Sequence, residues 1–115
     1  MTMYTEGLHT AEFLLDDEDS YSREQVTIDA SAPDMSAGTV IGKLTASGKY
    51  VPYNNANTDG SQTAVAILYA HAPDLTVDQK ATIVARQAEV ASYALVGLDA
   101  PARVELAAVG IIVRD

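Results

Sequence analysis

The sequence contains no cysteine and no tryptophan, and Phe13 is its single phenylalanine among 115 residues. The absence of cysteine excludes disulfide bonds, thiolate metal sites and cysteine nucleophiles. Aromatic residues make up only 6% of the chain, whereas hydrophobic residues make up 48%. We therefore expect one domain with a modest core built from Val, Ile, Leu and Ala side chains.

Long apolar runs are also missing. No run approaches the roughly 18 residues that a membrane-spanning helix requires. Residues 1–6 lack the basic and then apolar order of a secretory signal. These absences lead us to expect a soluble protein that is made and used inside a cell, without a membrane partner.

Basic residues are scarce, with 7 Lys and Arg against 16 Asp and Glu, for a net charge of −9. Phosphate backbones are bound by clusters of Lys and Arg, so we expect no nucleic-acid partner. Residues 1–34 hold nine acids and one base, whereas residues 35–115 hold seven acids and six bases. This asymmetry predicts an acidic N-terminal arm over residues 1–30 and a nearly neutral, β-rich domain over residues 31–115.

The arm has too few apolar residues to repay the cost of ordering its backbone, about 1–2 kcal/mol per residue. We expect it to be mobile in isolation. Two of its pieces still have strand-like patterns, an apolar patch at residues 12–15 and an alternating stretch at 25–30. The first interpretation is that these pieces become strands only when they pair with a sheet of another protein. The alternative is that the arm packs as an edge strand on its own domain.

From Ser31 onward, turn residues separate short apolar segments, as in a β-rich domain. We expect strands near 39–44, 50–53, 64–70 and 111–113, with Pro52 at an edge or at the end of its strand. The run 64–70 is the expected centre of the core. Residues 76–97 are ambiguous, because their helical spacing competes with strand-like residues, and 102–109 are predicted to be helical up to Gly110.

The sequence offers little chemistry. Residues 55–60 match the first half of a calcium-binding loop, but Ala66 occupies the position that needs a bidentate Glu. The acidic run 16–19 is better explained as a solvated charge run, and His9 and His71 have no ligand-spaced partners. There is no nucleophile elbow and no glycine-rich phosphate loop. We expect no catalytic residue, no metal and no cofactor, and hence no enzyme.

Five blocks of residues, taken in order, resemble one known family. They are residues 21–23 (Tyr-Ser-Arg), 37–42 (Ala-Gly-Thr-Val-Ile-Gly), 47–53 (Ser-Gly-Lys-Tyr-Val-Pro-Tyr), 59–69 (Asp-Gly-Ser-Gln-Thr-Ala-Val-Ala-Ile-Leu-Tyr) and 106–114, which ends in Gly-Ile-Ile-Val-Arg. This series is similar to the tailed-bacteriophage head decoration proteins of the lambda D type. The resemblance runs from about residue 13 to the C-terminus.

The resemblance implies a mainly β, β-clip-like small domain with one or two short helices and an extended N-terminal arm. It implies a strand over 81–90 and short helical pieces near 93–98 and 102–109. One departure is Gly97, near which relatives often carry Trp. The implied function is viral capsid decoration: trimers bind three-fold and quasi-three-fold positions outside the expanded phage head and stabilise it against DNA pressure. The protein would then occupy the outer surface of the virion, and the host cytoplasm during assembly.

The implied partners are the major capsid protein and further copies of this chain. The arm would become ordered on the capsid by adding a strand, over residues 5–15, to an exposed sheet edge. The expected capsid-binding residues are Thr5, Leu8, Phe13, Leu14 and Leu15. The alternative function is a small acidic protein-interaction module or inhibitor unrelated to capsids.

Overall fold

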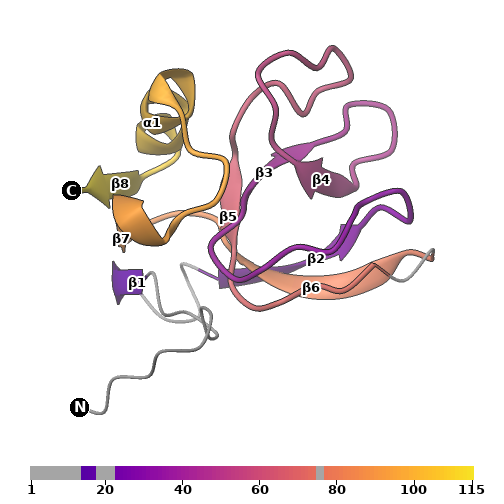
Figure 1. Ribbon diagram of the computed structural model, residues 1–115, viewed down its shortest axis with the longest axis horizontal. Coiled ribbons are helices and arrows are strands. Elements are labelled where there is room, and N and C mark those ends of the chain that lie inside the picture. The colour runs from indigo at the N-terminus through magenta and orange to yellow at the C-terminus, as the bar shows by residue number, and fades with distance from the viewer. Residues whose placement is uncertain (1–13, 18–22, 75–76) are drawn as a thin grey trace.

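A computed structural model describes residues 14–17, 23–74 and 77–115 (Figure 1). Within these residues the chain forms short strands, a 3₁₀ helix at Ser92–Ala94 and one α-helix. The elements are β1 (Leu14–Asp17), β2 (Arg23–Ile28), β3 (Val40–Lys43), β4 (Tyr50–Pro52), β5 (Ala66–Leu68), β6 (Gln79–Val84), β7 (Ala88–Ala91), α1 (Ala100–Ala108) and β8 (Ile111–Arg114). The predicted mainly β fold with short helices is confirmed.

Five strands close into a barrel in the order β2-β4-β3-β5-β6. The longest pairing is antiparallel and runs along all of β2 and β6, from Arg23 opposite Val84 to Ile28 opposite Gln79. Closure depends on β2 and β4, which are parallel and meet at a single pair, Ile28 opposite Tyr50. We call this short β2–β4 junction the barrel seam.

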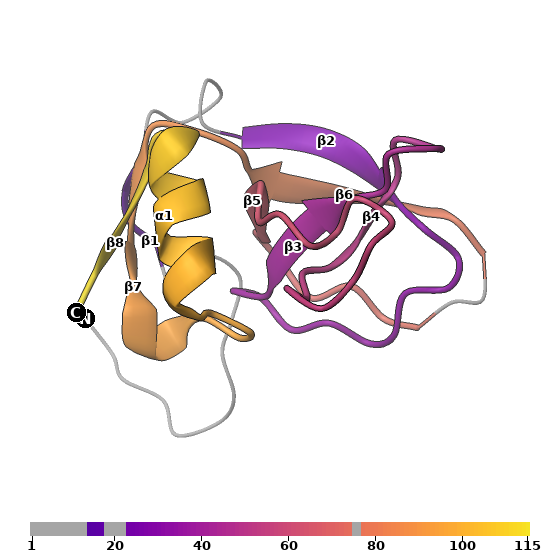
Figure 2. The same cartoon turned by 90° about the horizontal axis from the view of Figure 1, so that it is seen from above.

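The second sheet has the order β1-β7-β8. Strand β1 is antiparallel to β7, and β8 is parallel to β7. Parallel neighbours need a crossover connection, and α1 supplies it by packing against β8. Figure 2 shows α1 between β7 and β8 on one side and the barrel on the other. Among the described residues, no helix has the length and apolar character needed to cross a bilayer.

The core consists of two clusters that share the barrel strands. One cluster fills the barrel interior and includes Ile41, Leu68 and Ile83. The other lies between the barrel and the α1 layer and combines Val40, Ile67, Val84, Val90, Leu106 and Ile111 with smaller residues. Adjacent residues of one strand therefore enter different clusters, so these strands are buried on both faces. Double burial explains why 64–70 is continuously apolar instead of alternating.

The described part of the ambiguous stretch, residues 77–97, forms β6, β7 and the 3₁₀ helix, so the helix favoured by its periodicity is wrong. The region 81–90, which the resemblance implied to be a strand, consists of two strands that are separated at residues 85–87. The apparent helical spacing has a local cause. Gln87, between the two strands, adopts a positive φ of 50°. This break shifts the alternation of buried positions between β6 and β7, which places Val84, Ala88 and Ala91 at intervals of four and three residues.

The boundary expected at residue 30 does not coincide with the start of the barrel. Strand β2 belongs to the barrel, and Val26 and Ile28 are buried in its interior. The barrel therefore begins at Arg23, inside the stretch that the sequence assigned to the arm. The acidic composition did not reveal this, because Glu24 is exposed at the start of β2 and pairs with Arg86 at 2.5 Å.

Candidate functional site

Strand β1 lies at an edge of the three-stranded sheet and carries two of the predicted site residues. Leu14 lies opposite Val90 and Asp17 opposite Ala88, with a register irregularity between Leu14 and Asp16. For Leu14–Asp17 the structure thus shows the edge-strand alternative, on the protein's own domain. Thr5, Leu8 and Phe13, like His9, lie outside the described residues.

The free edge of β1 is the feature that suits a partner strand. In the described sheet β1 has β7 as its neighbour and no strand on its other side. An edge strand presents backbone N–H and C=O groups that another chain can pair with. The neighbouring strand β7 is anchored to the domain, because Val90 is buried and Glu89 accepts a hydrogen bond from Arg114 Nε of β8 at 2.9 Å. The sheet can therefore serve as a platform for β-strand addition.

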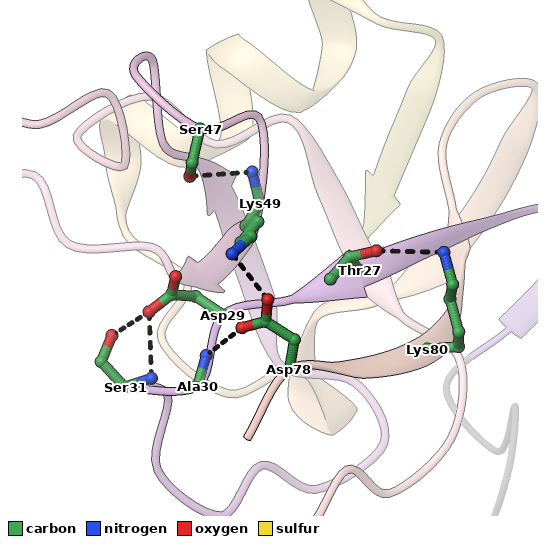
Figure 3. Close-up of polar contacts among 8 residues, drawn as sticks. All are labelled: Thr27, Asp29, Ala30, Ser31, Ser47, Lys49, Asp78 and Lys80. Carbon is green, nitrogen blue, oxygen red and sulfur yellow. Dashed lines mark hydrogen bonds and ion pairs between the residues drawn. The ribbon is translucent and has the colours of Figure 1, made fainter. Parts of the chain in front are cut away.

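A polar cluster braces the barrel seam (Figure 3). Lys49, just before β4, lies 2.6 Å from an Asp78 carboxylate oxygen, and the other oxygen accepts the Ala30 N–H at 2.9 Å. The Asp29 N–H also donates to the Tyr50 carbonyl at 3.0 Å. The hydrogen bond with Asp78 raises the pKa of Lys49. Asp78, just before β6, thus ties the start of β4 to the end of β2, two strands that pair with each other at only one position.

The remaining contacts in Figure 3 serve local turns and strands. The Asp29 carboxylate accepts hydrogen bonds from the side chain and the backbone N–H of Ser31, and these bonds lower the pKa of Asp29. Lys80 Nζ donates to Thr27 Oγ1 at 3.2 Å, which links β6 to β2. The charged groups of this cluster are engaged within the chain, so the cluster has the character of a structural brace.

A second polar contact fixes α1 on the barrel. Tyr53 is 6% exposed, and its hydroxyl donates to Asp99 Oδ1 at 2.8 Å. The same oxygen caps α1 by accepting the Ala102 N–H at 2.9 Å. Burial first, and then the hydrogen bond to Asp99, raise the pKa of Tyr53 to about 12. Sequence reasoning missed this contact, although Asp99 followed by Pro101 is a signature of a helix start.

The calcium-like loop folds as an ordinary turn. Asp59 accepts hydrogen bonds from the Ser61 backbone N–H at 3.1 Å and from its hydroxyl at 2.6 Å, and these bonds lower the pKa of Asp59. Gly60 has a φ of 113°, and a Cβ there would lie 2.5 Å from the Lys43 carbonyl oxygen. The loop therefore packs tightly on the β3–β4 hairpin, with its carboxylate directed to the local backbone.

The other candidate for chemistry, His71, forms a solvent-exposed pair with Asp34, with 2.7 Å between Nε2 and Oδ1. His71 lines a hollow of about 340 Å³ together with its neighbours in residues 69–72, the first four residues of β6 and Gln25 of β2. Within residues 14–17, 23–74 and 77–115, no three His, Asp or Glu side chains come together in a way that could hold a metal ion. The geometry of this region is that of a surface hydrogen bond.

Comparison with known proteins identifies the family of this chain. Over residues 3–111 the chain matches the family described as bacteriophage lambda head decoration protein D. The chain belongs to this family. The match extends from the residues before β1 to the first residue of β8, so it includes the barrel, α1 and the strands β1 and β7 of the second sheet. No curated protein matches the chain significantly.

Membership in the lambda head decoration protein D family confirms the resemblance found in the sequence. Head decoration proteins are structural components of the phage head that bind the capsid, and theirs is not an enzyme family. The chain is therefore a phage capsid decoration protein.

Proposed function

We propose that this protein is a cementing protein that binds as trimers to the outside of the expanded phage head. The trimers occupy three-fold and quasi-three-fold positions and stabilise the shell against the pressure of packaged DNA. The observation that carries the proposal is the family match over residues 3–111. The protein acts by binding and has no catalytic role, and it resides in the host cytoplasm until it assembles on the virion.

The N-terminal arm makes the proposed contact with the major capsid protein. Residues 5–15 add a strand to a sheet edge of the capsid protein, and Thr5, Leu8, Phe13, Leu14 and Leu15 provide the side-chain contacts. Support comes from β1, because its pairing with β7 fixes the end of the arm in strand geometry while its other edge has no neighbour in the described sheet. A capsid strand on that edge would join the two proteins in one sheet.

Dependence on capsid expansion follows if the acceptor edge is created when the shell matures. The decoration protein would then bind mature heads without any chemical step. Trimer formation adds strength, because the second and third arms of a bound trimer engage at a high effective concentration. Weak single arms therefore suffice for stable decoration.

The net charge of −9 is compatible with an outer position. Packaged DNA repels an acidic surface, and a high net charge keeps an abundant protein soluble before assembly. The acids are concentrated in residues 1–34, where nine of the 16 lie. Six of these acids precede the barrel, at residues 6–19, and no Lys or Arg accompanies them. Docking of the arm would bring this negative charge to the capsid surface, which predicts basic residues beside the acceptor edge and binding that weakens with salt.

Truncation tests this mechanism. A variant that lacks residues 1–13 keeps β1 and should retain the oligomeric mass and thermal stability of the full chain. It should no longer co-sediment with expanded heads, because Thr5, Leu8 and Phe13 are gone. Unexpanded heads are the control and should bind neither protein. Undiminished binding of the truncated protein to expanded heads would remove the arm from the mechanism.

A further inference from the structure

Asp59, in the loop between β4 and β5, is the only aspartate or asparagine of the sequence that a glycine follows. Such an aspartate is prone to a spontaneous rearrangement of the backbone, because glycine has no side chain to hinder ring closure. The Gly60 nitrogen attacks the side-chain carboxyl carbon of Asp59 and forms an N–C bond. One carboxyl oxygen leaves as water, with the amide hydrogen and the acid proton. Water then opens the succinimide ring at either carbonyl, which gives aspartate again or isoaspartate.

The attacking nitrogen is held by a hydrogen bond in the folded protein. The Gly60 N–H donates to Gln62 Oε1 at 2.7 Å. Gln62 is partly buried, so its side chain is restrained by the surrounding loop. Since hydrogen bonds are directional, the Gly60 nitrogen has to give up this bond before it can turn toward the Asp59 carboxyl carbon.

The carboxyl group is held on the other side by Ser61. Asp59 Oδ1 accepts hydrogen bonds from the Ser61 backbone N–H at 3.1 Å and from the Ser61 hydroxyl at 2.6 Å. Ser61 is fully buried, and its hydroxyl accepts a further hydrogen bond from Asn57 Nδ2 at 2.8 Å. The two bonds from Ser61 lower the pKa of Asp59, which reduces the protonated form that can lose water.

The backbone on both sides of the reacting bond is fixed against the β3–β4 hairpin. The Thr45 N–H donates to the Asp59 carbonyl oxygen at 3.0 Å. Gly60 lies so close to the hairpin that an added Cβ would be 2.5 Å from Thr45 Oγ1. Ring closure requires the Asp59 side chain and the Gly60 nitrogen to turn toward each other, and this packing opposes that movement.

We propose that Asp59 is a site of spontaneous isoaspartate formation that the folded loop keeps unreactive. Gln62 and Ser61 hold the two reacting groups apart, so conversion requires the loop to open. Isoaspartate adds one carbon atom to the path of the backbone, and the tight packing of Gly60 on Thr45 leaves no room for it. A converted chain is therefore less stable than the original. The inference goes beyond the proposed function and does not depend on it.

The test is incubation of the full chain at physiological temperature and neutral pH, with isoaspartate at position 59 quantified over time. Peptide mapping with electron-transfer fragmentation locates the isoaspartate, and labelling by isoaspartyl methyltransferase measures its amount. The wild type is incubated folded in buffer and unfolded in guanidinium chloride. The folded protein should convert at least about tenfold more slowly, because the reaction has to wait for local opening of the loop.

Two substitutions test the roles of the loop residues. Gln62→Ala frees the Gly60 N–H, and Ser61→Ala removes the hydroxyl that binds Asp59. Each should raise the rate of conversion in the folded protein by roughly fivefold, the change expected when one hydrogen bond of ordinary strength is lost. In the unfolded state both variants should convert at the wild-type rate. Circular dichroism checks that both are folded in buffer.

The matched control is Gln25→Ala, which truncates an exposed glutamine on β2 and should keep the wild-type rate. Asp59→Glu lengthens the side chain by one methylene group, disfavours the succinimide ring and should remove the signal from the unfolded chain. The inference is overturned if the folded wild type converts as fast as the unfolded chain, or if Asp59 does not convert even when unfolded. It is also overturned if both loop variants keep the folded wild-type rate, or if Gln25→Ala accelerates conversion equally.

Discussion

Replacing Tyr53 with phenylalanine removes a buried hydroxyl from the contact between the barrel and α1. In the structure this hydroxyl donates to Asp99 Oδ1 at 2.8 Å, and Tyr53 is 6% exposed. The substitution preserves the ring and therefore the packing of Tyr53 with Val40, Leu106 and the rest of its cluster. It isolates one hydrogen bond between the barrel and the start of α1.

The size of the effect follows from what each partner loses. A hydrogen bond to a charged group contributes about 1.5–3 kcal/mol. Asp99 keeps its hydrogen bond from the Ala102 N–H and access to water, so no buried polar group is left unpaired. The lower part of the range therefore applies, and Tyr53→Phe should lower the free energy of unfolding by about 1.5–2 kcal/mol. With an unfolding entropy of about 2.1 cal/mol/K per residue, this corresponds to a fall in Tm of roughly 6–8 °C.

The pH dependence provides a second signature. The pKa of Tyr53 is raised from 10.0 to about 12 in the folded protein. A raised folded-state pKa contributes stability that is complete below the unfolded pKa and is lost as the pH rises through the folded pKa. The stability advantage of the wild type over Tyr53→Phe should therefore be constant below pH 10 and shrink between pH 10 and 12. Other titrating groups, including Tyr50, cancel in this difference.

The assay is urea unfolding followed by circular dichroism, at equal protomer concentration for every variant, because association shifts apparent stability. The control is Tyr93→Phe, which removes the hydroxyl of a tyrosine that is 86% exposed and should change stability by less than about 0.5 kcal/mol. Equal losses in the two variants, or an unchanged stability of Tyr53→Phe, would refute a stabilising role for the Tyr53–Asp99 contact.

Two further substitutions probe the barrel. Gly42→Ala should lower the free energy of unfolding by at least about 2 kcal/mol, because its Cβ would lie 2.6 Å from the Ser61 Cα and would have to displace backbone; a loss below about 0.5 kcal/mol in chemical denaturation would contradict this close approach. Ile67→Ala should cost about 2–5 kcal/mol, since Ile67 is fully buried. Ile112→Ala, at an exposed isoleucine, should cost less than about 1 kcal/mol in the same assay, and similar losses for the two isoleucines would show that the core has been misplaced.

Most strands of the barrel are predictable from the sequence because turn residues mark their ends. Gly48 and Pro52 bracket β4, and the apolar run around Ile67 contains β5. The limits of β6 and β7 are not predictable from periodicity. They depend on the positive φ of Gln87, and the pattern of apolar and polar residues does not predict a break of this kind.

The placement of β2 shows why composition alone misjudged the arm. The alternation of Val26 and Ile28 was recognised as strand-like, and both residues are buried in the barrel. The neighbouring acids suggested an unstructured segment, but Glu24 pairs with Arg86, which lies 62 positions away in the sequence. A long-range ion pair of this kind cannot be identified before the fold is known.

The candidate site was only partly visible in the sequence. The apolar residues Leu14 and Leu15 indicated a strand, and the structure adds that this strand lies at a sheet edge beside β7. The exposed apolar side of α1 was missed because Ala and Val at helical spacing look like core positions. Only the packing shows that Leu106 faces the core while Val104 faces outward.

Imaging of expanded heads with and without the protein tests decoration most directly. Cryo-electron microscopy of isolated expanded heads incubated with the full chain should show added density on the outer surface at the three-fold and quasi-three-fold axes. Heads incubated without the chain should lack that density and should lose DNA at lower internal pressure. Bare axes at saturating protein, or heads that withstand the same pressure with and without the chain, would contradict a cementing function.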